Sequence, residues 1–307
     1  MKRFLLCIIA VSGFYSGAHA QQDPLYAQYL NNPLSINPAY AGLNNNFNIA
    51  TGYRTQWTGF DGHPETFTLN SHISLVDNKV GAGFVLSSDK IGNVNNTEFQ
   101  GTFSYKLELA DDKVFSFGLQ GGFINFRNNI TNLNLADETD EVFTQNGNVT
   151  KPNFGAGMIL KSERYMVGLS VPRLLSTNIS VMSNGALQNY ELYNKHYYLF
   201  GAYVFYLNER LRFKPSTLLK IVKGAPASVD LNLNLNIDQN YTVGAYTRNF
   251  TSYGLLLQAL FGDKYKLGYA FEVPTSKSVG ASFSSHEIYL GIVLPVLSYH
   301  QRSVSNF

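Results

Sequence analysis

The chain has 307 residues and a formal net charge of +2, with 14% charged and 14% aromatic residues. A soluble domain usually carries about 25% charged residues, and a helical membrane protein needs an apolar stretch of about 18 residues, which this sequence lacks. No basic tract occurs, so nucleic-acid binding has no support. The composition favours a membrane β-barrel with an apolar outside and a polar inside.

Residues 1–20 have the pattern of a secretory signal peptide. Lys2 and Arg3 precede an apolar run of about 11 residues, and Ala18-His19-Ala20 fits a small-residue cleavage site. The run is too short to span a bilayer as a helix, which makes a membrane anchor the weaker alternative. We therefore expect a mature chain of 287 residues that starts at position 21, once 20 of the 307 residues are removed.

Cysteine content and charge exclude several kinds of site. The only cysteine, Cys7, lies in the expected signal peptide, so the mature chain has no thiol for a disulfide, a metal site or a nucleophile. Without the two basic residues at positions 2 and 3, the 23 basic residues fall to 21 and equal the 21 acidic ones. A mature chain without net charge has no general attraction for polyanions.

Segments of alternating polar and apolar residues recur along the chain and predict strands, because period two places each set on its own face of a sheet. Most have seven to twelve residues, which suits the apolar band of an outer-membrane barrel. We identify fourteen, with 154–160 and 211–222 alternating poorly: 47–57, 67–75, 80–86, 99–109, 115–123, 154–160, 165–171, 197–205, 211–222, 229–237, 241–247, 253–261, 265–273 and 287–294.

The connections between these segments alternate in length. Short polar connections at 76–79, 110–113, 162–164, 208–210, 238–240 and 262–264 are interleaved with connections that are mostly longer, at 58–65, 88–96, 128–151, 172–195, 223–227, 249–252 and 274–286. Short periplasmic turns and long outer loops are typical of up-and-down membrane barrels. The sequence thus predicts an all-β, transmembrane antiparallel barrel of about 14 strands, to within one hairpin, with both termini in the periplasm.

The polar faces of the expected strands predict the residues that line the lumen. They could serve an ion path or a docking surface for peptide, but mixed charges inside a barrel also pair across neighbouring strands. The residues we assign to the lumen are His72, Lys106, Glu108, Asp230, Asn232, Asn234 and Glu272.

Residues 21–46 differ from the expected barrel at 47–307. Three prolines follow Asp or Asn, which favours turns rather than helix. Several Tyr, Leu and Ile residues make the segment too apolar for a free tail. We expect it to pack against the lower lumen or the periplasmic rim of the barrel.

Two runs in this segment, 28–33 (QYLNNP) and 37–42 (NPAYAG), resemble the opening of the PorP/SprF family. The run 54–57 (RTQW), the loop 59–62 and the run 285–288 (SHEI) are also similar to family patterns. The resemblance implies a Bacteroidota outer-membrane component of type IX secretion, linked in some members to gliding motility. It further implies that the protein supports export or surface retention of large proteins with C-terminal sorting domains.

The resemblance also implies partners: the secreted cargo, other secretion components and outer-membrane lipid, but no nucleic acid. The residues expected to dock a partner are those that carry the resemblance: Tyr26, Gln28, Tyr29, Asn32, Pro33, Asn37, Pro38, Tyr40, Arg54, Gln56 and Trp57. A general solute porin is the alternative function.

Candidate chemistry is weak. Ser71 and His72, like Ser285 and His286, are adjacent on expected strands and so point to opposite faces, which disfavours a nucleophile–base pair. We therefore predict no catalytic residue, no enzyme and no cofactor. The acidic residues Asp137, Glu138, Asp140 and Glu141 could attract Ca²⁺, but they lack the glycine turn of a calcium loop, and a solvated loop is favoured.

Overall fold

The alternation of polar and apolar residues produces the strands that it predicts. The computed structural model describes residues 27–75, 78–109, 112–129, 147–183, 186–222, 225–275 and 283–295. Each of the fourteen predicted segments corresponds to a strand: β1 (Asn46–Thr55), β2 (Glu65–Leu75), β3 (Val80–Ile91), β4 (Val94–Leu109), β5 (Lys113–Asn128), β6 (Gly147–Lys161), β7 (Tyr165–Val171), β10 (His196–Tyr203), β12 (Leu211–Val222), β13 (Ser228–Ile237), β14 (Tyr241–Arg248), β15 (Ser252–Phe261), β16 (Tyr265–Pro274) and β17 (Ser285–Pro295).

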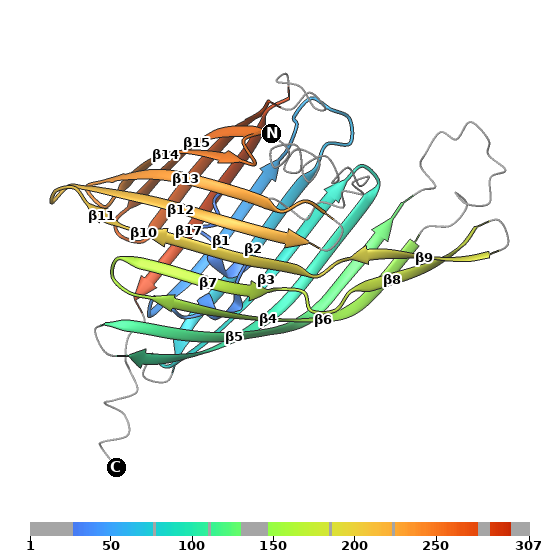
Figure 1. Cartoon of the computed structure of the whole chain (residues 1–307), viewed down its shortest axis with the longest axis horizontal. Helices are drawn as coiled ribbons and strands as arrows, with labels where there is room; N and C mark the ends of the chain where they lie inside the picture. The colour runs from blue at the N-terminus through green and yellow to red at the C-terminus, as the bar shows by residue number, and fades with distance from the viewer. Residues whose placement is uncertain are drawn as a thin grey trace, which may run out of the picture.

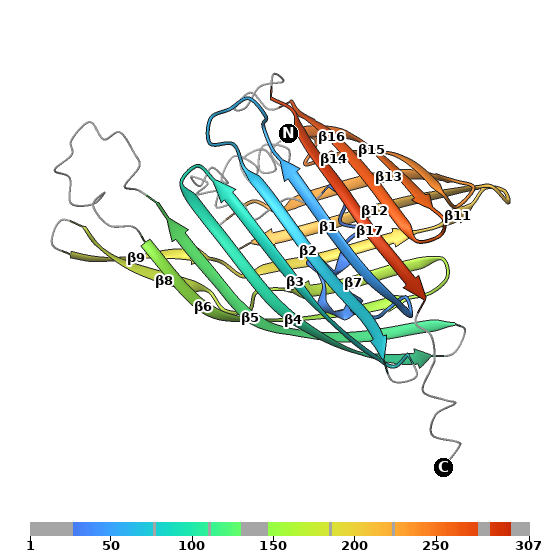
Figure 2. The ribbon, with the colours of Figure 1, turned by 180° about the vertical axis from the view of Figure 1, so that it is seen from behind.

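These strands form one closed antiparallel barrel (Figures 1 and 2). Each strand pairs with its neighbours along the chain, β10 pairs with both β7 and β12, and β1 pairs with β17 to complete the ring. The predicted up-and-down barrel of about fourteen strands is confirmed. Among the described residues, no helix is long and apolar enough to cross a membrane.

The two ends of the barrel differ in their connections. At the short-turn end, β1 begins, β17 ends, and brief turns follow β2, β4, β6, β13 and β15; the opposite end is the long-loop end. One expected long connection, 88–96, is instead a tight turn, because β3 continues to Ile91 and β4 begins at Val94.

Two further strands were not predicted, and a third, short strand begins at the last residue of the predicted segment 197–205. β8 (Thr177–Ser183) and β9 (Ala186–Tyr193) form a separate two-stranded sheet within the expected loop 172–195, and they extend beyond the wall at the long-loop end (Figure 1). β11 (Phe205–Tyr206) continues β10 after a break at Val204 and pairs with β12 in the same register. The same register places Pro215 of β12 opposite Tyr203, the last residue before this break, and a strand proline is tolerated at such an irregularity.

The two faces of the wall differ in polarity as the alternation predicts. Many large apolar side chains are exposed on the outside, among them Leu233, Leu255 and Phe123, whereas polar residues such as Asn232 and Asn234 are buried inside. An apolar exterior over a polar interior is the arrangement of a barrel that is surrounded by lipid.

We expect Leu233→Arg to lower the free energy of unfolding by about 2–4 kcal/mol, since a basic residue on the lipid face near the midplane costs that much. Leu233 lies near the middle of β13 and is 54% exposed. Asn232→Ala, its inward neighbour, is the control and should have a smaller effect. The measurement is chemical unfolding in lipid vesicles; equal effects would contradict the assignment of the two faces.

Candidate functional site

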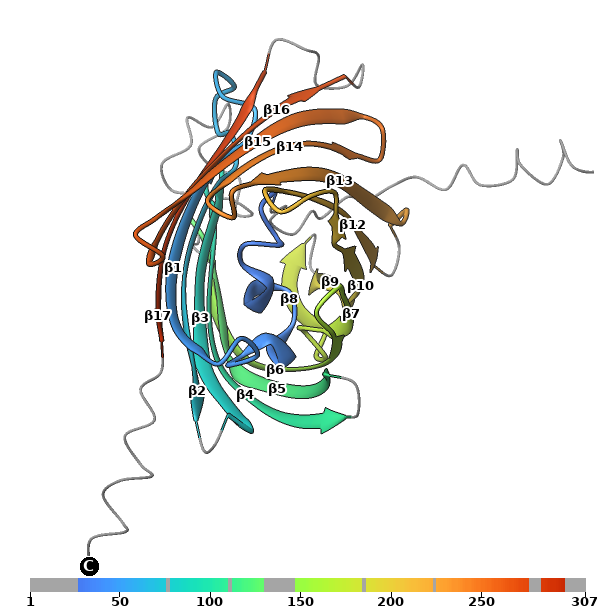
Figure 3. The same ribbon diagram turned by 90° about the vertical axis from the view of Figure 1, so that its left-hand side faces the viewer.

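A stretch of chain that is not part of the wall lies inside the barrel. Residues 27–45, called the lumenal segment below, run within the ring of strands before the chain enters β1 (Figure 3). The segment contains two 3-10 helices, η1 (Pro33–Ser35) and η2 (Pro38–Tyr40). Each begins with proline, whose fixed φ and missing N–H suit that position. Asn37 caps η2 by accepting a hydrogen bond of 2.9 Å from the backbone N of Ala39.

The lumenal segment supplies half of the largest apolar cluster in the lumen. Its buried side chains pack against apolar residues that point inward from β6, β10 and β12. Burial of a large apolar side chain contributes about 1.5–3 kcal/mol, so this contact favours an ordered segment. The cluster consists of Tyr29, Ile36, Ala39 and Leu43 from the segment and Ile159, Tyr198, Phe200 and Leu218 from the wall.

Two wall glycines allow the segment to approach closely. A Cβ at Gly118 of β5 would overlap the backbone N of Ala39, and one at Gly81 of β3 would overlap the carbonyl O of Ala41. Atoms of the segment therefore occupy the space that larger side chains would need. The wall at these two positions is shaped to receive backbone.

Side-chain hydrogen bonds join the segment to the wall and satisfy buried backbone groups that the two short 3-10 helices leave unpaired. Asn37 Nδ2 donates to the carbonyl oxygens of Met158 and Leu169 on adjacent strands, at 3.2 and 3.0 Å. Three serine hydroxyls donate to carbonyl oxygens of the segment: Ser170 to Ile36 at 2.6 Å, Ser116 to Ala39 at 2.7 Å and Ser104 to Ala41 at 2.6 Å.

Lys106 and His72 hold the end of the segment, just before β1. Lys106 Nζ donates to Gly42 O at 2.7 Å, to Asn45 Oδ1 at 2.7 Å and to Ser74 Oγ at 2.9 Å. His72 Nδ1 accepts a hydrogen bond of 3.1 Å from the backbone N of Gly42. An accepting Nδ1 means that this imidazole is neutral, with its proton on Nε2.

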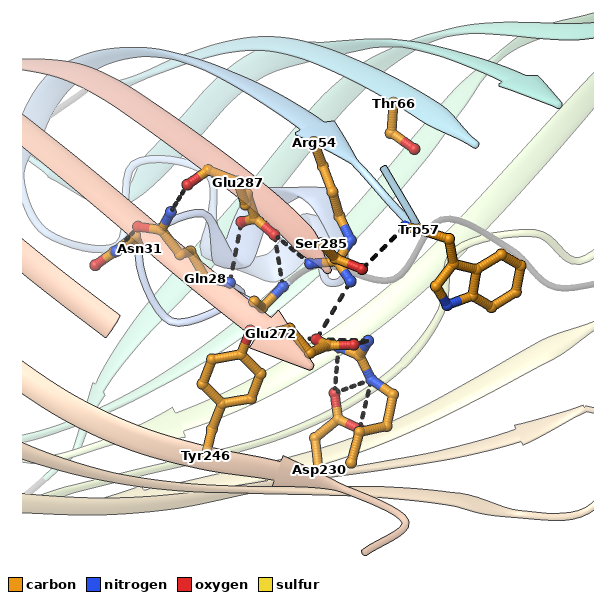
Figure 4. Close-up of polar contacts among 12 residues, drawn as sticks. Gln28, Asn31, Arg54, Trp57, Thr66, Asp230, Tyr246, Glu272, Ser285 and Glu287 are labelled. Carbon is orange, nitrogen blue, oxygen red and sulfur yellow. Dashed lines mark hydrogen bonds and ion pairs between the residues drawn. The ribbon is translucent and has the colours of Figure 1, made fainter. Parts of the chain in front are cut away.

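Five charged side chains form a buried network in the long-loop half of the lumen (Figure 4). Arg54 bonds Glu272 at 3.2 Å and Glu287 at 3.3 Å. Arg248 bonds Asp230 at 3.1 Å and Glu272 at 3.3 Å. Arg54 faces Glu287, and Arg248 faces Asp230, directly across paired strands. These contacts are the cross-strand pairing that the mixed charges suggested.

The lumenal segment completes this network. The network has three carboxylates and two guanidiniums, so one negative charge needs other partners. The backbone N atoms of Ala27 and Gln28 donate to the Glu287 carboxylate at 2.8 and 3.1 Å, and the Tyr246 hydroxyl donates to Glu272 at 3.2 Å. Glu287 therefore fixes the first described residues of the segment, which extends further from the short-turn end than we expected.

Two tyrosines of the segment act as uncharged hydrogen-bonding groups. The hydroxyl of Tyr29 lies 3.1 Å from Ser216 Oγ, and Asn44 Nδ2 donates to the hydroxyl of Tyr40 at 2.7 Å. Burial raises the pKa of Tyr40 to about 12 and raises the pKa of Tyr29 well above its usual value. Both phenols therefore stay protonated at neutral pH.

Most residues expected to dock a partner contact the barrel wall instead of an open surface. Tyr26 lies outside the described residues. Arg54 belongs to the network, Gln56 is buried, and the backbone N of Trp57 donates to Ser285 Oγ at 3.3 Å near the long-loop end. Tyr40 is partly buried, and the remaining residues are buried within the lumen: Gln28, Tyr29, Asn32, Pro33, Asn37 and Pro38.

The residues assigned to the lumen by sequence fall into two groups. Glu108 is exposed and lines a cavity at the short-turn end. The others are buried on the inward face of the wall: His72, Lys106, Asp230, Asn232, Asn234 and Glu272. The sequence did not single out Arg248 or the buried serines, nor the role of Glu287. The sequence did contain one signal for the network: all five of its charged residues lie near the long-loop ends of their strands.

The weak catalytic candidates are not brought together as pairs. Ser71 Oγ donates to the backbone of Asn48, whereas His72 accepts from the lumenal segment. His286 lies 2.7 Å from the hydroxyl of Tyr269. Within the described ranges, no group of three or more His, Cys, Asp or Glu residues could hold a metal ion, and the acidic residues 137–141 lie outside those ranges.

The space left in the lumen is uneven. Cavities of about 390 and 490 Å³ lie at the short-turn end, lined in part by Asn44 and Lys161. A cavity of only about 40 Å³ lies nearer the long-loop end, beside Glu98, Arg173 and His196.

The fold is similar to that of outer-membrane channels. A deltaS2S3 mutant of the monoaromatic hydrocarbon channel TodX matches with a TM-score of 0.50 and 11% identity, over 86% of this chain and 94% of the channel. The toluene transporter TodX of Pseudomonas putida matches with a TM-score of 0.45 and 9% identity, over 90% of this chain and 94% of its own. At 11% identity the likeness to the first of these concerns the fold alone.

The sequence itself matches one family. No curated protein matches it significantly. The family model for the type IX secretion system membrane protein PorP/SprF matches residues 18–292, which include the lumenal segment and nearly the whole barrel. The resemblance seen in the runs at 28–33 and 37–42 is thereby confirmed, and the chain belongs to the PorP/SprF family of type IX secretion system membrane proteins.

Proposed function

We propose that this protein is a plugged outer-membrane barrel that supports export or surface retention of large secreted proteins with C-terminal sorting domains. A link to gliding motility is part of the same proposal. The observation that supports it is the lumenal segment, which is held by apolar packing, wall hydrogen bonds and the Glu287 contacts. A channel for solutes needs an open path, whereas ordered chain occupies this lumen.

The proposal includes an orientation. Short turns face the periplasm and long loops face outward in barrels of this kind. We place the start of β1 and the end of β17 in the periplasm on that basis, and we place the β8–β9 hairpin outside, where it could contact exported protein. The partners would be cargo, other secretion components and lipid; we propose no catalytic or cofactor role.

Deletion of residues 22–40, with the signal peptide kept, tests the plug. The remaining chain keeps every wall strand, and a closed barrel has no free edge that needs the segment. We expect the variant to insert in the membrane, to conduct steadily in planar bilayers and to lose surface display of its cargo.

The intact protein is the control and should show little or no conductance. Retained display in the deletion variant would contradict the interaction role. Steady conductance by the intact protein would instead favour the alternative of a solute porin. Heat-dependent mobility in SDS gels reports separately whether each barrel has folded.

A further inference from the structure

The cavity of about 390 Å³ at the short-turn end has a basic lining. Lys161 is the last residue of β6, Lys266 is the second residue of β16, and Lys214 lies near the start of β12, so three ammonium groups approach from different strands. Among the described residues that line the cavity, Glu163 in the turn after β6 is the only acidic one, and Arg164 adds a fourth basic group.

None of the three lysines has an acidic partner in the described part of the chain, and two of them have no hydrogen-bond partner there either. Lys161 Nζ donates to Asn44 Oδ1 at 2.6 Å, but Lys214 and Lys266 form no hydrogen bond or ion pair with any described residue. The network at the opposite end differs, since each of its cations bonds carboxylates. Lys266 is exposed and Lys214 is partly buried, and cations that line a cavity without counter-charges attract an anion from solution.

The remaining lining favours peptide over a simple ion. Asn31, Asn236, Asn240 and Gln258 line the same cavity, and an amide offers both donors and acceptors, as a peptide bond requires. The volume falls in the range of sites that enclose small organic ligands, about 300–1,000 Å³, which exceeds what a single oxyanion needs.

We propose that this cavity binds a short acidic peptide segment presented at the short-turn end, with its carboxylates on Lys214 and Lys266. The lumenal segment contributes Leu30, Asn31, Tyr40 and Asn44 to the same lining. A ligand that contacts both the segment and the wall should favour the position that the segment has in this structure. This site lies at the opposite end from the loops proposed to contact cargo, so neither proposal depends on the other.

The test uses the full mature barrel in detergent and a fluorescein-labelled tetra-aspartate peptide, with binding followed by anisotropy. Wild type should bind, and the binding should weaken as salt screens the charges. The double variant Lys214→Gln/Lys266→Gln should lose at least about tenfold in affinity, which corresponds to about 1.4 kcal/mol. The matched control, Lys79→Gln/Lys264→Gln, changes two exposed turn lysines at the same end outside this cavity and should bind as wild type does.

Two further probes separate the sources of the anion. A labelled tetra-asparagine peptide should not bind; equal binding would overturn the proposal, as would unchanged affinity in the Lys214/Lys266 variant. Inorganic phosphate should compete only weakly. If phosphate binds in the cavity and the acidic peptide cannot displace it, the site takes a free oxyanion. The peptide proposal would then fail.

Discussion

Arg54→Met is expected to lower the free energy of unfolding by about 3–5 kcal/mol, the usual cost of removing one partner from a buried ion pair. Arg54 is 3% exposed and bridges Glu272 and Glu287. Without it, three buried carboxylates would share the single guanidinium of Arg248. Chemical unfolding in vesicles measures the change.

A second substitution tests whether charge is the cause. Adding Glu287→Gln to Arg54→Met removes one of the stranded carboxylates, so the double variant should lose less than the sum of the two single variants. Arg210→Met is the control, because the Arg210–Asp238 pair has good geometry but lies in solvent at a turn. A loss for Arg210→Met as large as that for Arg54→Met would show that burial of the network is not the cause.

Gly118→Val is expected to displace the lumenal segment and to turn a closed lumen into a conducting one. Valine suits a strand, but its side chain would overlap the backbone of Ala39 at η2. Because the overlapping atoms are backbone, no rotamer change relieves the clash, and the segment has to move away. Single-channel recording should show steady conductance that wild type lacks.

The matched control is Gly201→Val, which adds the same side chain on β10 where nothing lies within 4 Å of the new Cβ. That variant should remain closed. Protease cleavage within residues 27–45 should also rise in Gly118→Val alone. A closed lumen in both variants would mean that the segment can shift without leaving the lumen.

The strands could be predicted because alternation reports directly which side chains face lipid. The two weakest segments, β6 and β12, alternate poorly for a reason that the structure supplies. Ile159 and Leu218 are apolar but point inward, into the cluster that also contains Tyr29 and Leu43 of the lumenal segment. An apolar residue on the polar face of a strand was therefore a sign that it has an apolar packing partner inside the lumen.

The path of the lumenal segment could not be predicted from sequence. Its composition indicated that it packs somewhere, but its partners are single serines and glycines on many strands, such as Ser104, Ser116 and Gly118. Those residue types are common and carry no pattern of their own. Likewise, β8 and β9 pair only with each other and not with the wall. The alternation of short and long connections therefore predicted only a long loop where they lie.

The position of Glu287 has a consequence for how the barrel is assembled. β17 forms the seam of the ring with β1, joining strands more than 200 residues apart in the chain. The same strand carries the carboxylate that bonds Ala27 and Gln28. The entropy of loop closure has to be paid before contacts this distant in sequence can form, so we expect closure of the seam and the contacts of Glu287 with the segment to form together. A barrel whose seam stays open would therefore also lack the Glu287 contacts that hold the first described residues of the lumenal segment.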